Sequence, residues 1–384
     1  MGLIKSVITF VFKCLFFLFP VNDKKVFFSN FNGKGYSDNP RSIYEALKKL
    51  HPDWKLIWWI NNPNAKVPSD VKYVKNRISA MFAMATSKVI VNNVKDLLPF
   101  IKKRKQFYLQ TWHGGAGFKL VEKDAEEFLR KDYIKSSKKE SRITDAVIAD
   151  NAYQISVFKR AFYYKDNIEI LEYGCPRNDV FHHIDENRIK EFKKSIGVKE
   201  DSKIIIYVPT FRDDGDTSVY NLDFKRILNA FKERDHLDYV MLVRLHPNVP
   251  SDFKVSGEGI DVINVSRYPD AETIWISSDI MISDYSSVPF EFLEMNKIIY
   301  FYWPDYSEKI RLGKDFFNFG FEISKSEDEL IESIKHFDKK EFDKVVNNYN
   351  SKMKLFNKGD ASFKAAKKIE SICLDKSWRS NNVR

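Results

Sequence analysis

Cysteine is scarce in this sequence. The 384 residues include only three, Cys14, Cys175 and Cys373, which lie far apart and never in a CxxC spacing. This distribution excludes a disulfide framework and a structural zinc site, because both need clustered cysteines. It is consistent with a reducing, cytoplasmic environment.

Repeats and nucleic-acid signatures are also missing. The sequence has no repeat of solenoid period and no low-complexity linker, and no RNA-binding or helix-turn-helix signature accompanies its basic runs at Lys102–Lys105 and Lys135–Lys139. We interpret both runs as solvated surface and expect no nucleic-acid partner. The net charge is nevertheless +10, from 63 Lys and Arg against 53 Asp and Glu, so the chain can attract phosphate-rich partners such as anionic lipid or a nucleotide.

The N-terminal segment from Ile4 to Val21 is apolar, yet it is short for a membrane span. A spanning helix needs roughly 20 apolar residues, whereas this segment contains Lys5 and Lys13 and stops at Pro20. No small-residue cleavage site follows it, as one would in a signal peptide. We therefore predict a helix that lies in the membrane interface. A helix packed on the protein body and a true span are the alternatives.

Length and composition indicate a globular chain with more than one domain. Apolar residues make up 43% of the sequence and charged residues 30%, and 32 residues are Phe. These values exclude disordered and collagen-like classes. A single hydrophobic core stops growing at roughly 250–300 residues, so a chain of 384 residues is expected to form two domains.

Short β-branched or aromatic runs alternate with helical stretches from Lys24 onward, which is the pattern of parallel sheets covered by helices. The expected strands are Lys25–Asn30, Lys55–Ile60, Val71–Val74, Lys88–Asn92, Gln106–Trp112 and Ala146–Asp150 in the first half, and Lys203–Thr210, Tyr239–His246, Val262–Val265, Ile280–Asp284 and Ile298–Trp303 in the second. We predict an α/β fold of two Rossmann-like domains that face each other across a cleft.

Four parts of the chain follow from this pattern: a membrane-associating segment (1–21), an N-terminal Rossmann-like domain (22–180), a C-terminal Rossmann-like domain (181–345) and a helical tail (346–384). The tail carries apolar residues at helical spacing from Ala365 to Cys373. One face of that helix should therefore be buried. We expect the helix to cross back to the first domain.

His113 is expected at the end of a strand. The segment QFYLQTWHGGAGFK, Gln106 to Lys119, predicts a strand that ends at His113 and enters a glycine-rich turn. Ligands of open parallel sheets bind beyond the carboxyl ends of the strands, so this imidazole is placed for proton transfer beside a phosphate. The alternative is a turn that needs glycine only for backbone geometry.

Arg244 and His246 follow a second strand in the same way, in the segment VRLHPN. They present a guanidinium and an imidazole at the strand end, although histidines in turns are common. The two strand-end histidines could meet across one cleft. Arg binds phosphate through a forked set of donors, which makes Arg244 and Arg212 candidates for phosphate contacts.

The segment IMISDYSSVPFEFLEMN, Ile280 to Asn296, predicts a strand that gives way to a helix after Asp284. Ser286 and Ser287 are suitable N-cap residues, and Pro289 is tolerated in the first turn. The free N–H groups of such a terminus, with two hydroxyls, suit a diphosphate. Capping alone is the alternative interpretation.

A fourth strand end carries Thr210 and Arg212, in the segment VPTFRDD, and we expect both side chains to reach the same cleft. Asp213, Asp214 and Asp216 follow closely. They could hold a metal ion, but an acidic loop is more often only solvated, and we expect no metal site here.

Six ordered segments extend through most of the chain: FFSNFNGKGYSDNPRSIYEAL (27–47), QTWHG (110–114), YGCPRND (173–179), PTFRDD (209–214), RLHP (244–247) and SDYSSVPFEFL (283–293). As a set they resemble the CDP-glycerol glycerophosphotransferase family, the teichoic-acid primases and polymerases. One of these segments alone would be a weak signal, whereas six in order are specific.

The resemblance implies a GT-B fold and a position on the cytoplasmic face of the cell membrane. It also implies transfer of glycerol phosphate or ribitol phosphate from a CDP-polyol to a lipid-linked acceptor, with release of CMP. The CDP-polyol is then a substrate, and neither a cofactor nor a divalent metal is evident. The N-terminal domain would serve the acceptor and the C-terminal domain the CDP donor.

Carried onto this chain, the resemblance makes His113 the catalytic base, with His246 assisting at the phosphate. The loop from Asp284 to Ser287 would hold the donor diphosphate. The expected donor-binding residues are Thr210, Arg212, Arg244, Asp284, Ser286 and Ser287. The residues expected on the acceptor side or in the backbone of the site are Gly114, Gly115, Lys119, Arg177, Asn178 and Asp179.

The acceptor and the reaction class leave alternatives open. Gly115 and Ala116 stand where the family commonly has Thr-Pro, so wall teichoic acid and a capsular polymer both remain possible acceptors. A GT-B glycosyltransferase that uses a sugar nucleotide would share the fold but release UDP or GDP. A catalytically idle membrane protein that binds anionic polymer would have no nucleotide affinity.

Overall fold

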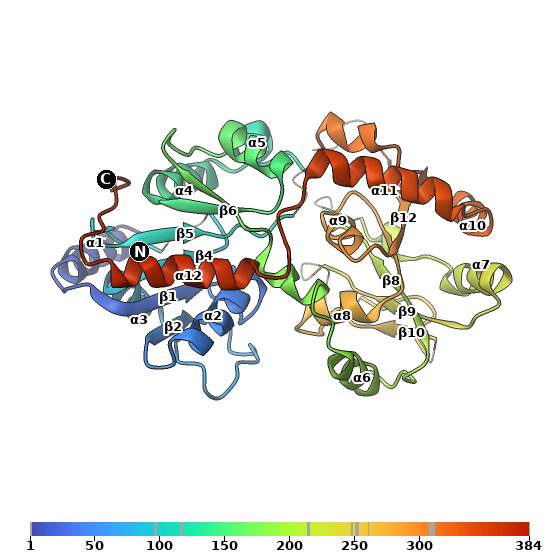
Figure 1. Cartoon of the computed structure of the whole chain (residues 1–384), viewed down its shortest axis with the longest axis horizontal. Coiled ribbons are helices and arrows are strands. Elements are labelled where there is room, and N and C mark those ends of the chain that lie inside the picture. The colour runs from blue at the N-terminus through green and yellow to red at the C-terminus, as the bar shows by residue number, and fades with distance from the viewer. Residues whose placement is uncertain are drawn as a thin grey trace. The chain divides into compact units, whose positions relative to one another are not determined.

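Two parallel β-sheets with helices on their faces form the framework of the chain (Figure 1). The computed structural model describes residues 2–95, 98–115, 118–212, 216–246, 249, 253–259, 261–306 and 312–383. The chain divides into two compact units, the first made of Met1–Gly114, Val121–Asp179 and Lys354–Arg384 and the second of Gly115–Leu120 and Val180–Met353. The prediction of an α/β chain with parallel sheets is confirmed.

The first unit is built on a seven-stranded parallel sheet in the order β3-β2-β1-β4-β5-β6-β7. Its strands are β1 (Asn22–Ser29), β2 (Lys55–Trp59), β3 (Tyr73–Val74), β4 (Ser87–Asn92), β5 (Phe107–Gln110), β6 (Ala146–Ala149) and β7 (Glu169–Glu172). Its helices are α1 (Gly2–Phe17), α2 (Asp38–Leu50), α3 (Arg77–Ala85), α4 (Lys131–Ile143), α5 (Ala152–Ala161) and α12 (Ala361–Leu374), with a 3-10 helix η1 at Glu122–Phe128. Strands β4, β5 and β6 are buried along their whole length, as expected for a parallel sheet between helical layers.

The second unit is built on a six-stranded parallel sheet in the order β10-β9-β8-β11-β12-β13. Its strands are β8 (Lys203–Val208), β9 (Tyr239–Val243), β10 (Val262–Asn264), β11 (Ile280–Ser283), β12 (Ile298–Tyr302) and β13 (Ile323–Ser324). Its helices are α6 (Glu186–Ser195), α7 (Phe224–Asp235), α8 (Ala271–Ser277), α9 (Val288–Leu293), α10 (Glu327–Lys335) and α11 (Lys339–Met353), with 3-10 helices η3 (Ser218–Tyr220) and η4 (Lys314–Phe319). A further 3-10 helix, η2 (Pro176–Phe181), contains the point where the chain enters this unit.

Helix α12 belongs to the first unit and lies beside α2 and β1 (Figure 1). Ala365, Ala366 and Ile369 are buried in the same cluster as Leu47 of α2, so the apolar face expected from the sequence is covered. The turn before η2 also depends on this tail. Gly174 has φ +90°, and a Cβ on it would lie 2.5 Å from the backbone of Asn357, so only glycine fits there.

Every strand expected from the sequence is present. The sequence patterns do not predict β7 or β13, which are short strands at the edges of their sheets. The expected N-terminal helix is present as α1. None of the helices among the described residues combines the length and the apolar character that a membrane span requires.

Candidate active site

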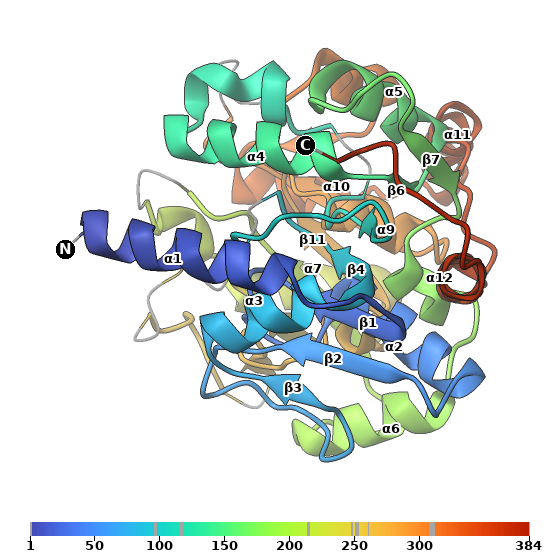
Figure 2. The same ribbon diagram turned by 90° about the vertical axis from the view of Figure 1, so that its left-hand side faces the viewer.

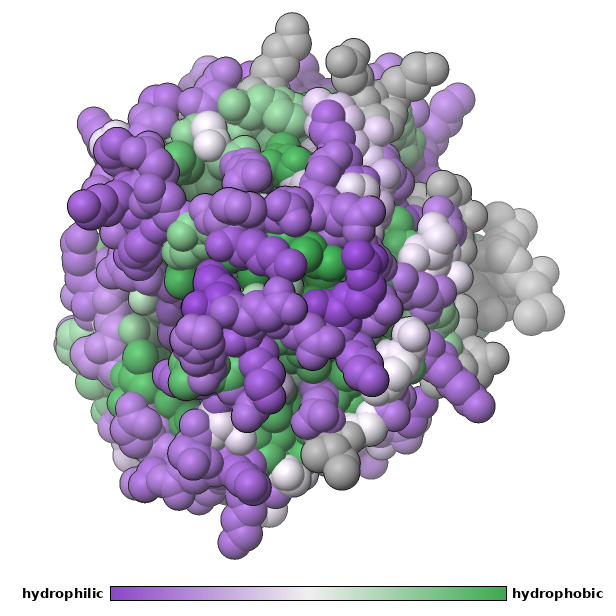
Figure 3. Space-filling view, turned by 90° about the vertical axis from the view of Figure 1, so that its right-hand side faces the viewer, coloured by the Kyte–Doolittle hydropathy of each residue, from purple (hydrophilic) through white to green (hydrophobic). Residues whose placement is uncertain are grey.

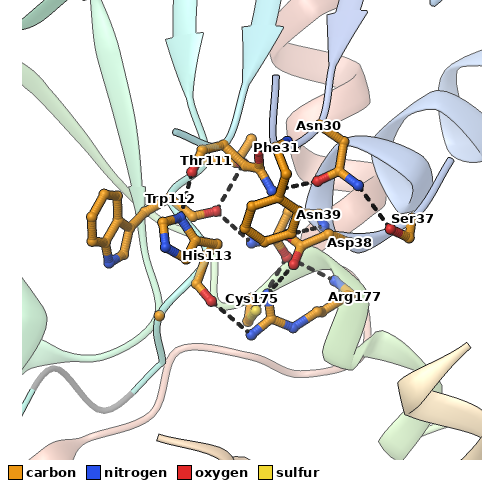
Figure 4. A network of polar contacts seen from close by, with 12 residues as sticks. Asn30, Phe31, Ser37, Asp38, Asn39, Thr111, Trp112, His113, Cys175 and Arg177 are labelled. Carbon is orange, nitrogen blue, oxygen red and sulfur yellow. Dashed lines mark hydrogen bonds and ion pairs between the residues drawn. The ribbon is translucent and has the colours of Figure 1, made fainter. Parts of the chain in front are cut away.

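His113 lies just beyond the end of β5, as the sequence predicts. The backbone turns sharply before it, because Trp112 has φ +54°, a left-handed conformation that is rare for a bulky residue. Two hydrogen bonds hold this turn: the Trp112 N–H donates to Oε1 of Gln110 at 2.8 Å, and Nδ2 of Asn39 donates to the Trp112 carbonyl at 3.1 Å. The strained backbone fixes the direction in which His113 leaves the sheet (Figure 4).

A hydrogen bond to the backbone of Asn93 determines the tautomer of His113. Nδ1 of His113 lies 2.6 Å from the backbone carbonyl oxygen of Asn93. A carbonyl oxygen can only accept, so Nδ1 carries the hydrogen and Nε2 keeps its lone pair. Burial lowers the pKa of His113, and the bond to Asn93 opposes this effect in part. The ring is therefore neutral near pH 7 and can accept a proton at Nε2.

A chain of asparagine side chains supports the Asn93 carbonyl. Nδ2 of Asn93 donates to Oδ1 of Asn30 at 2.6 Å, and Nδ2 of Asn30 donates to Oγ of Ser37 at 2.7 Å. The N–H of Phe31 donates to Oδ1 of Asn93 at 2.9 Å, while the Phe31 ring packs edge-on against His113. The sequence patterns do not mark these asparagines as functional residues, although Asn30 lies in the first of the six segments.

Arg177 is engaged inside the first unit. Its Nη1 pairs with Oδ2 of Asp38 at 2.8 Å, and its Nη2 donates to the His113 carbonyl at 3.1 Å (Figure 4). Asn178 is buried, and its N–H donates to the Cys175 carbonyl. Asp179 accepts from the N–H groups of Ala361 and Ser362 at the start of α12. These residues, expected on the acceptor side, hold the backbone around His113 and α12.

The glycine turn after His113 passes from one unit to the other. The Gly114 carbonyl accepts from Nε2 of Gln154 in the first unit at 2.6 Å. Gly115 belongs to the second unit, where a Cβ on it would lie 3.2 Å from Cγ of Glu291. Lys119 is exposed in the second unit, with Nζ 5.9 Å from the centre of the Tyr285 ring. Ala116 lies outside the described residues.

Asp284 is the centre of the polar cluster in the second unit. Its Oδ1 accepts from Oγ1 of Thr210 at 2.5 Å, and the Thr210 N–H donates to Oδ2 at 3.0 Å. Nη1 of Arg212 donates to Oδ2 of Asp284 at 2.7 Å. Asp284 is 2% exposed, so the strand ends of β8 and β11 are tied together by its carboxylate.

Arg212 has a second carboxylate partner that sequence analysis missed. Its Nε and Nη2 donate to the two oxygens of Asp305, at 2.6 and 2.8 Å, in a bidentate pair. The guanidinium also lies over the Tyr285 ring, 4.8 Å from its centre. Burial alone would lower the pKa of Arg212, but the pairs with Asp305 and Asp284 raise it. The group stays charged and orders the loop that carries Tyr285.

Arg244 and His246 occupy different environments. Nη1 of Arg244 donates to the carbonyls of Val265 and Tyr268, at 3.2 and 2.8 Å, and burial lowers the pKa of this guanidinium. Arg244 therefore fastens the end of β9 to the segment after β10. His246 is exposed, with its ring centre 5.5 Å from that of Phe211. Pro247 and Asn248, which follow it, lie outside the described residues.

Ser287 is the N-cap of α9, and Pro289 stands in the first turn, as predicted. The Ser287 side chain makes no capping hydrogen bond, and Oγ of Ser286 accepts only a long one, 3.4 Å, from the Val288 N–H. Helix α9 has six residues, so its dipole is small, and the hydroxyls are the stronger reason to expect a ligand here.

Of the three aspartates that closely follow Arg212, the structure describes Asp216. Asp213 and Asp214 lie outside the described residues. The Asp216 carboxylate accepts from the N–H and Oγ of Ser218, at 2.8 and 2.9 Å. Among the residues with described positions, no group of three His, Cys, Asp or Glu side chains is placed to hold a metal ion.

Comparison with known proteins identifies the family. Residues 11–371 match the model of the CDP-Glycerol:Poly(glycerophosphate) glycerophosphotransferase family. The chain belongs to this family. The six segments that suggested the resemblance all lie within the matched range.

Curated relatives are teichoic-acid enzymes. The chain is 34% identical over 354 residues to the teichoic acid poly(glycerol phosphate) polymerase of Bacillus subtilis, covering 86% of this chain and 46% of that protein. It is 31% identical over 374 residues to the polymerase of Bacillus spizizenii, covering 92% and 93%. It is 33% identical over 307 residues to the teichoic acid glycerol-phosphate transferase of Staphylococcus aureus, covering 76% and 77%. The chain thus spans about half of the first relative and nearly all of the second.

A solved structure has the same fold. The wall teichoic acid polymerase TagF superposes with a TM-score of 0.82 at 27% identity, covering 96% of both chains. A variant of that polymerase soaked with CDPG superposes with a TM-score of 0.81 at 28% identity. The fold of this chain therefore agrees with the family to which its sequence assigns it.

Proposed function

We propose that this chain transfers a polyol-phosphate unit, glycerol phosphate first of all, from a CDP-polyol to a hydroxyl of a lipid-linked teichoic-acid or capsular polymer, with release of CMP. Family membership supports the reaction class. The observation that carries the chemistry is the His113 imidazole, which has its hydrogen on Nδ1 and its lone pair on Nε2. The proposal includes a GT-B-like architecture, with the first unit serving the acceptor and the second the CDP donor.

In the proposed reaction, an acceptor hydroxyl attacks the phosphorus that bears the polyol. A new P–O bond to the acceptor forms as the P–O bond to CMP breaks, and CMP takes the bonding electrons. Nε2 of His113 accepts the hydroxyl proton and later gives it to water. Positioning and charge stabilisation dominate phosphoryl transfer, so no covalent nucleophile is needed. His246, exposed beside Phe211, assists at the phosphate.

The identity of the nucleotide donor distinguishes the proposed transferase from a glycosyltransferase and from a polymer-binding protein without catalysis. Wild-type protein is offered CDP-glycerol, CDP-ribitol and UDP- or GDP-sugars together with a lipid-linked acceptor, and the released nucleotide is identified by chromatography. CMP release is expected. Release of UDP or GDP would instead support a glycosyltransferase, and absence of binding to every nucleotide would support a polymer-binding protein without catalysis.

The pH dependence of the rate should reflect the lowered pKa of His113. A protonated imidazole cannot accept a proton, so kcat/KM falls as the pH drops through the pKa of His113. Because burial lowers that pKa, we expect the midpoint of the acid limb below about 6.5, the ordinary value for histidine. A midpoint above that value would contradict His113 as a partly buried neutral base.

Ser286 and Ser287 are proposed to bind the donor diphosphate, with Thr210, Arg212, Arg244 and Asp284 ordering the loops around them. The Ser286→Ala/Ser287→Ala variant removes two hydroxyls that make little use of their donors inside the protein. Calorimetry should show a loss of CDP-glycerol affinity of at least about tenfold, since one hydrogen bond to a charged group contributes roughly 1.5–3 kcal/mol net and about 1.4 kcal/mol corresponds to a factor of ten. Ser218→Ala, on a different loop, is the control. Unchanged donor affinity in the double variant would remove these serines from the site.

We further propose that α1 holds the protein at the cytoplasmic membrane surface. Val7, Phe10 and Val11 are 56%, 61% and 56% exposed, which is unusual for large apolar side chains on one short helix. Interfacial helices bury such a face at the boundary between headgroups and acyl chains. Co-sedimentation of the full chain with vesicles tests the attachment, and a chain that stays in the supernatant would contradict it.

A further inference from the structure

Helices α3 and α4 cover the same face of the first sheet (Figure 2). Ile143 of α4 packs there with Met84 of α3 and Ile90 of β4. Side chains alternate between the two faces of a strand, so Gln110 of β5, two residues after Tyr108 of the same cluster, also points toward α4. A polar side chain in this position needs hydrogen-bond partners, because unpaired polar groups are costly to bury.

Glu140 of α4 is such a partner for Gln110. Nε2 of Gln110 donates to Oε1 of Glu140 at 2.7 Å and to the Val94 carbonyl at 3.1 Å, and the Gln110 and Glu140 side chains are fully buried. Carboxylate and carbonyl oxygens only accept, so the amide NH2 group faces them and Oε1 of Gln110 is left to accept from the Trp112 N–H. Glu140 thereby orients the amide that holds the left-handed turn at Trp112.

The second oxygen of Glu140 pairs with Lys95, in the loop that follows β4. Nζ of Lys95 donates to Oε2 of Glu140 and, at 2.8 Å, to Oγ of Ser141. Lys95 lies two residues after Asn93, whose backbone carbonyl accepts from Nδ1 of His113. The ion pair therefore fastens to α4 the loop that determines the tautomer of His113.

The Lys95–Glu140 pair is unusual because neither side chain is exposed. The face of the second unit in Figure 3 is largely hydrophilic, and on α11 of that unit the side chains of Lys339 and Asp343 form an ion pair while 55% and 49% exposed. Burying two charges is costly, and apolar side chains of the same volume are often at least as stable. A role in positioning therefore explains the charges of Lys95 and Glu140 better than stability does.

We propose that Glu140 is a positioning residue for the catalytic base. Its carboxylate acts through Gln110 on the turn that directs His113, and through Lys95 on the loop that keeps the hydrogen at Nδ1. Both connections end at the same imidazole, so Nε2 is held in the one tautomer that can take the acceptor proton. The inference rests on the proposed role of His113 and adds the residue that maintains it.

The first test replaces the ion pair by apolar side chains of similar length, in the Lys95→Met/Glu140→Met variant. The variant should fold, because Met can pack against the Phe162 and Tyr164 rings that flank Lys95. Turnover measured by CMP release should fall roughly 10²-fold, the effect of a small displacement of a reacting group. KM for CDP-glycerol should stay at the wild-type value, because the proposed donor contacts belong to the second unit. Wild-type turnover would overturn the proposal.

The tautomer of His113 provides a measurement that does not depend on catalysis. Long-range proton–nitrogen NMR of histidine-labelled protein distinguishes a ring nitrogen that carries hydrogen from one that does not, and His113→Asn identifies the signal. Wild type should carry the hydrogen on Nδ1 alone, whereas Lys95→Met/Glu140→Met should show a mixture of tautomers. An unchanged single tautomer in that variant would contradict the positioning role.

Combining the variant with His113→Asn separates positioning from a general loss of stability. A residue that acts through His113 has no further effect once the imidazole is gone. The triple variant should therefore turn over as slowly as His113→Asn alone. A further loss of similar size would show that the ion pair acts elsewhere.

The Lys95→Met/Glu140→Gln variant restores an acceptor for Gln110 but not the bond to Lys95. It should lose turnover by about tenfold, less than the variant with two Met residues, because one of the two connections remains. This variant decides the question if Lys95→Met/Glu140→Met does not fold. Turnover at the wild-type rate would then overturn the proposal.

The matched control is Lys102→Met/Asp145→Asn, which removes another buried ion pair of the first unit, just before β6. Lys102 is buried, although the sequence pattern predicts it to be solvated. The control should keep the turnover and the His113 tautomer of wild type. A loss equal to that of Lys95→Met/Glu140→Gln would show a general effect of removing buried charge and would contradict a specific role for Glu140.

Failure of this inference and failure of the proposed reaction give different results. If wild type released no CMP from any donor, the reaction would be refuted, while NMR would still report whether Glu140 maintains the tautomer of His113. Wild-type turnover with an unchanged tautomer in Lys95→Met/Glu140→Met would refute the positioning role alone.

Discussion

His113→Asn is expected to lower turnover by ~10²–10⁴, the usual contribution of a general base, or roughly 3–5 kcal/mol of barrier. Asn is similar in reach but cannot accept a proton at neutral pH. It can still donate from Nδ2 to the Asn93 carbonyl, so the turn after β5 should persist. Affinity for CDP-glycerol should stay at the wild-type value, because the proposed donor contacts belong to the second unit.

His236→Asn provides a matched control for this substitution. His236 caps α7 with φ +56°, a left-handed conformation that Asn tolerates well. The control should therefore fold and turn over like wild type. Single-turnover CMP release measures the chemical step in both variants. If His113→Asn reacted at nearly the wild-type rate, His113 would be a structural turn residue and His246 the next candidate for the base.

Asp284→Ala should destabilise the second unit by about 3–5 kcal/mol, the usual effect of breaking a buried ion pair. The substitution removes the acceptor for the Thr210 N–H and hydroxyl and one of the two carboxylates around Arg212. The melting temperature should fall by roughly 10 °C. Donor affinity should also fall, because the loop that leads to Ser286 loses its attachment to β8.

Asp305→Ala tests the same guanidinium from its exposed side. The Asp305 side chain is 34% exposed, against 2% for Asp284, so water can replace much of its interaction with Arg212. Its loss should cost about 1 kcal/mol, typical of a partly exposed pair. Thermal melts that show equal losses for the two variants would contradict the view that Asp284 is the structural centre of this cluster.

The sequence predicted the strands because their signal is local. Runs such as Lys203–Thr210 combine β-branched residues with a clear end, and both sheets could be anticipated from such runs. Strands β7 and β13 lie at the edges of their sheets, where each pairs with a single neighbouring strand. The burial of α12 could be predicted because helical spacing of apolar residues is also local.

These local patterns could not predict hydrogen bonds and ion pairs between residues that are distant in sequence. The positions of His113 and Asp284 at strand ends could be predicted from strand signals and family motifs. Their hydrogen-bond partners lie elsewhere in the chain. Asn93 bonds to His113, and Asp305 bonds to Arg212, the arginine that pairs with Asp284. Distant residues also decide whether a guanidinium at a strand end is available to phosphate. Arg244 lies at such a strand end, but it donates to the backbone carbonyls of Val265 and Tyr268.

The stoichiometry of one reaction tests the proposed transfer of glycerol phosphate. Wild-type protein is incubated with CDP-glycerol and a lipid-linked acceptor. The released CMP is quantified by chromatography, and the molecular mass of the acceptor is measured by mass spectrometry. We expect one glycerol-phosphate unit to be added to the acceptor for each CMP released, with both products lost in His113→Asn. CMP released without growth of the acceptor, or acceptor growth that survives His113→Asn, would contradict it.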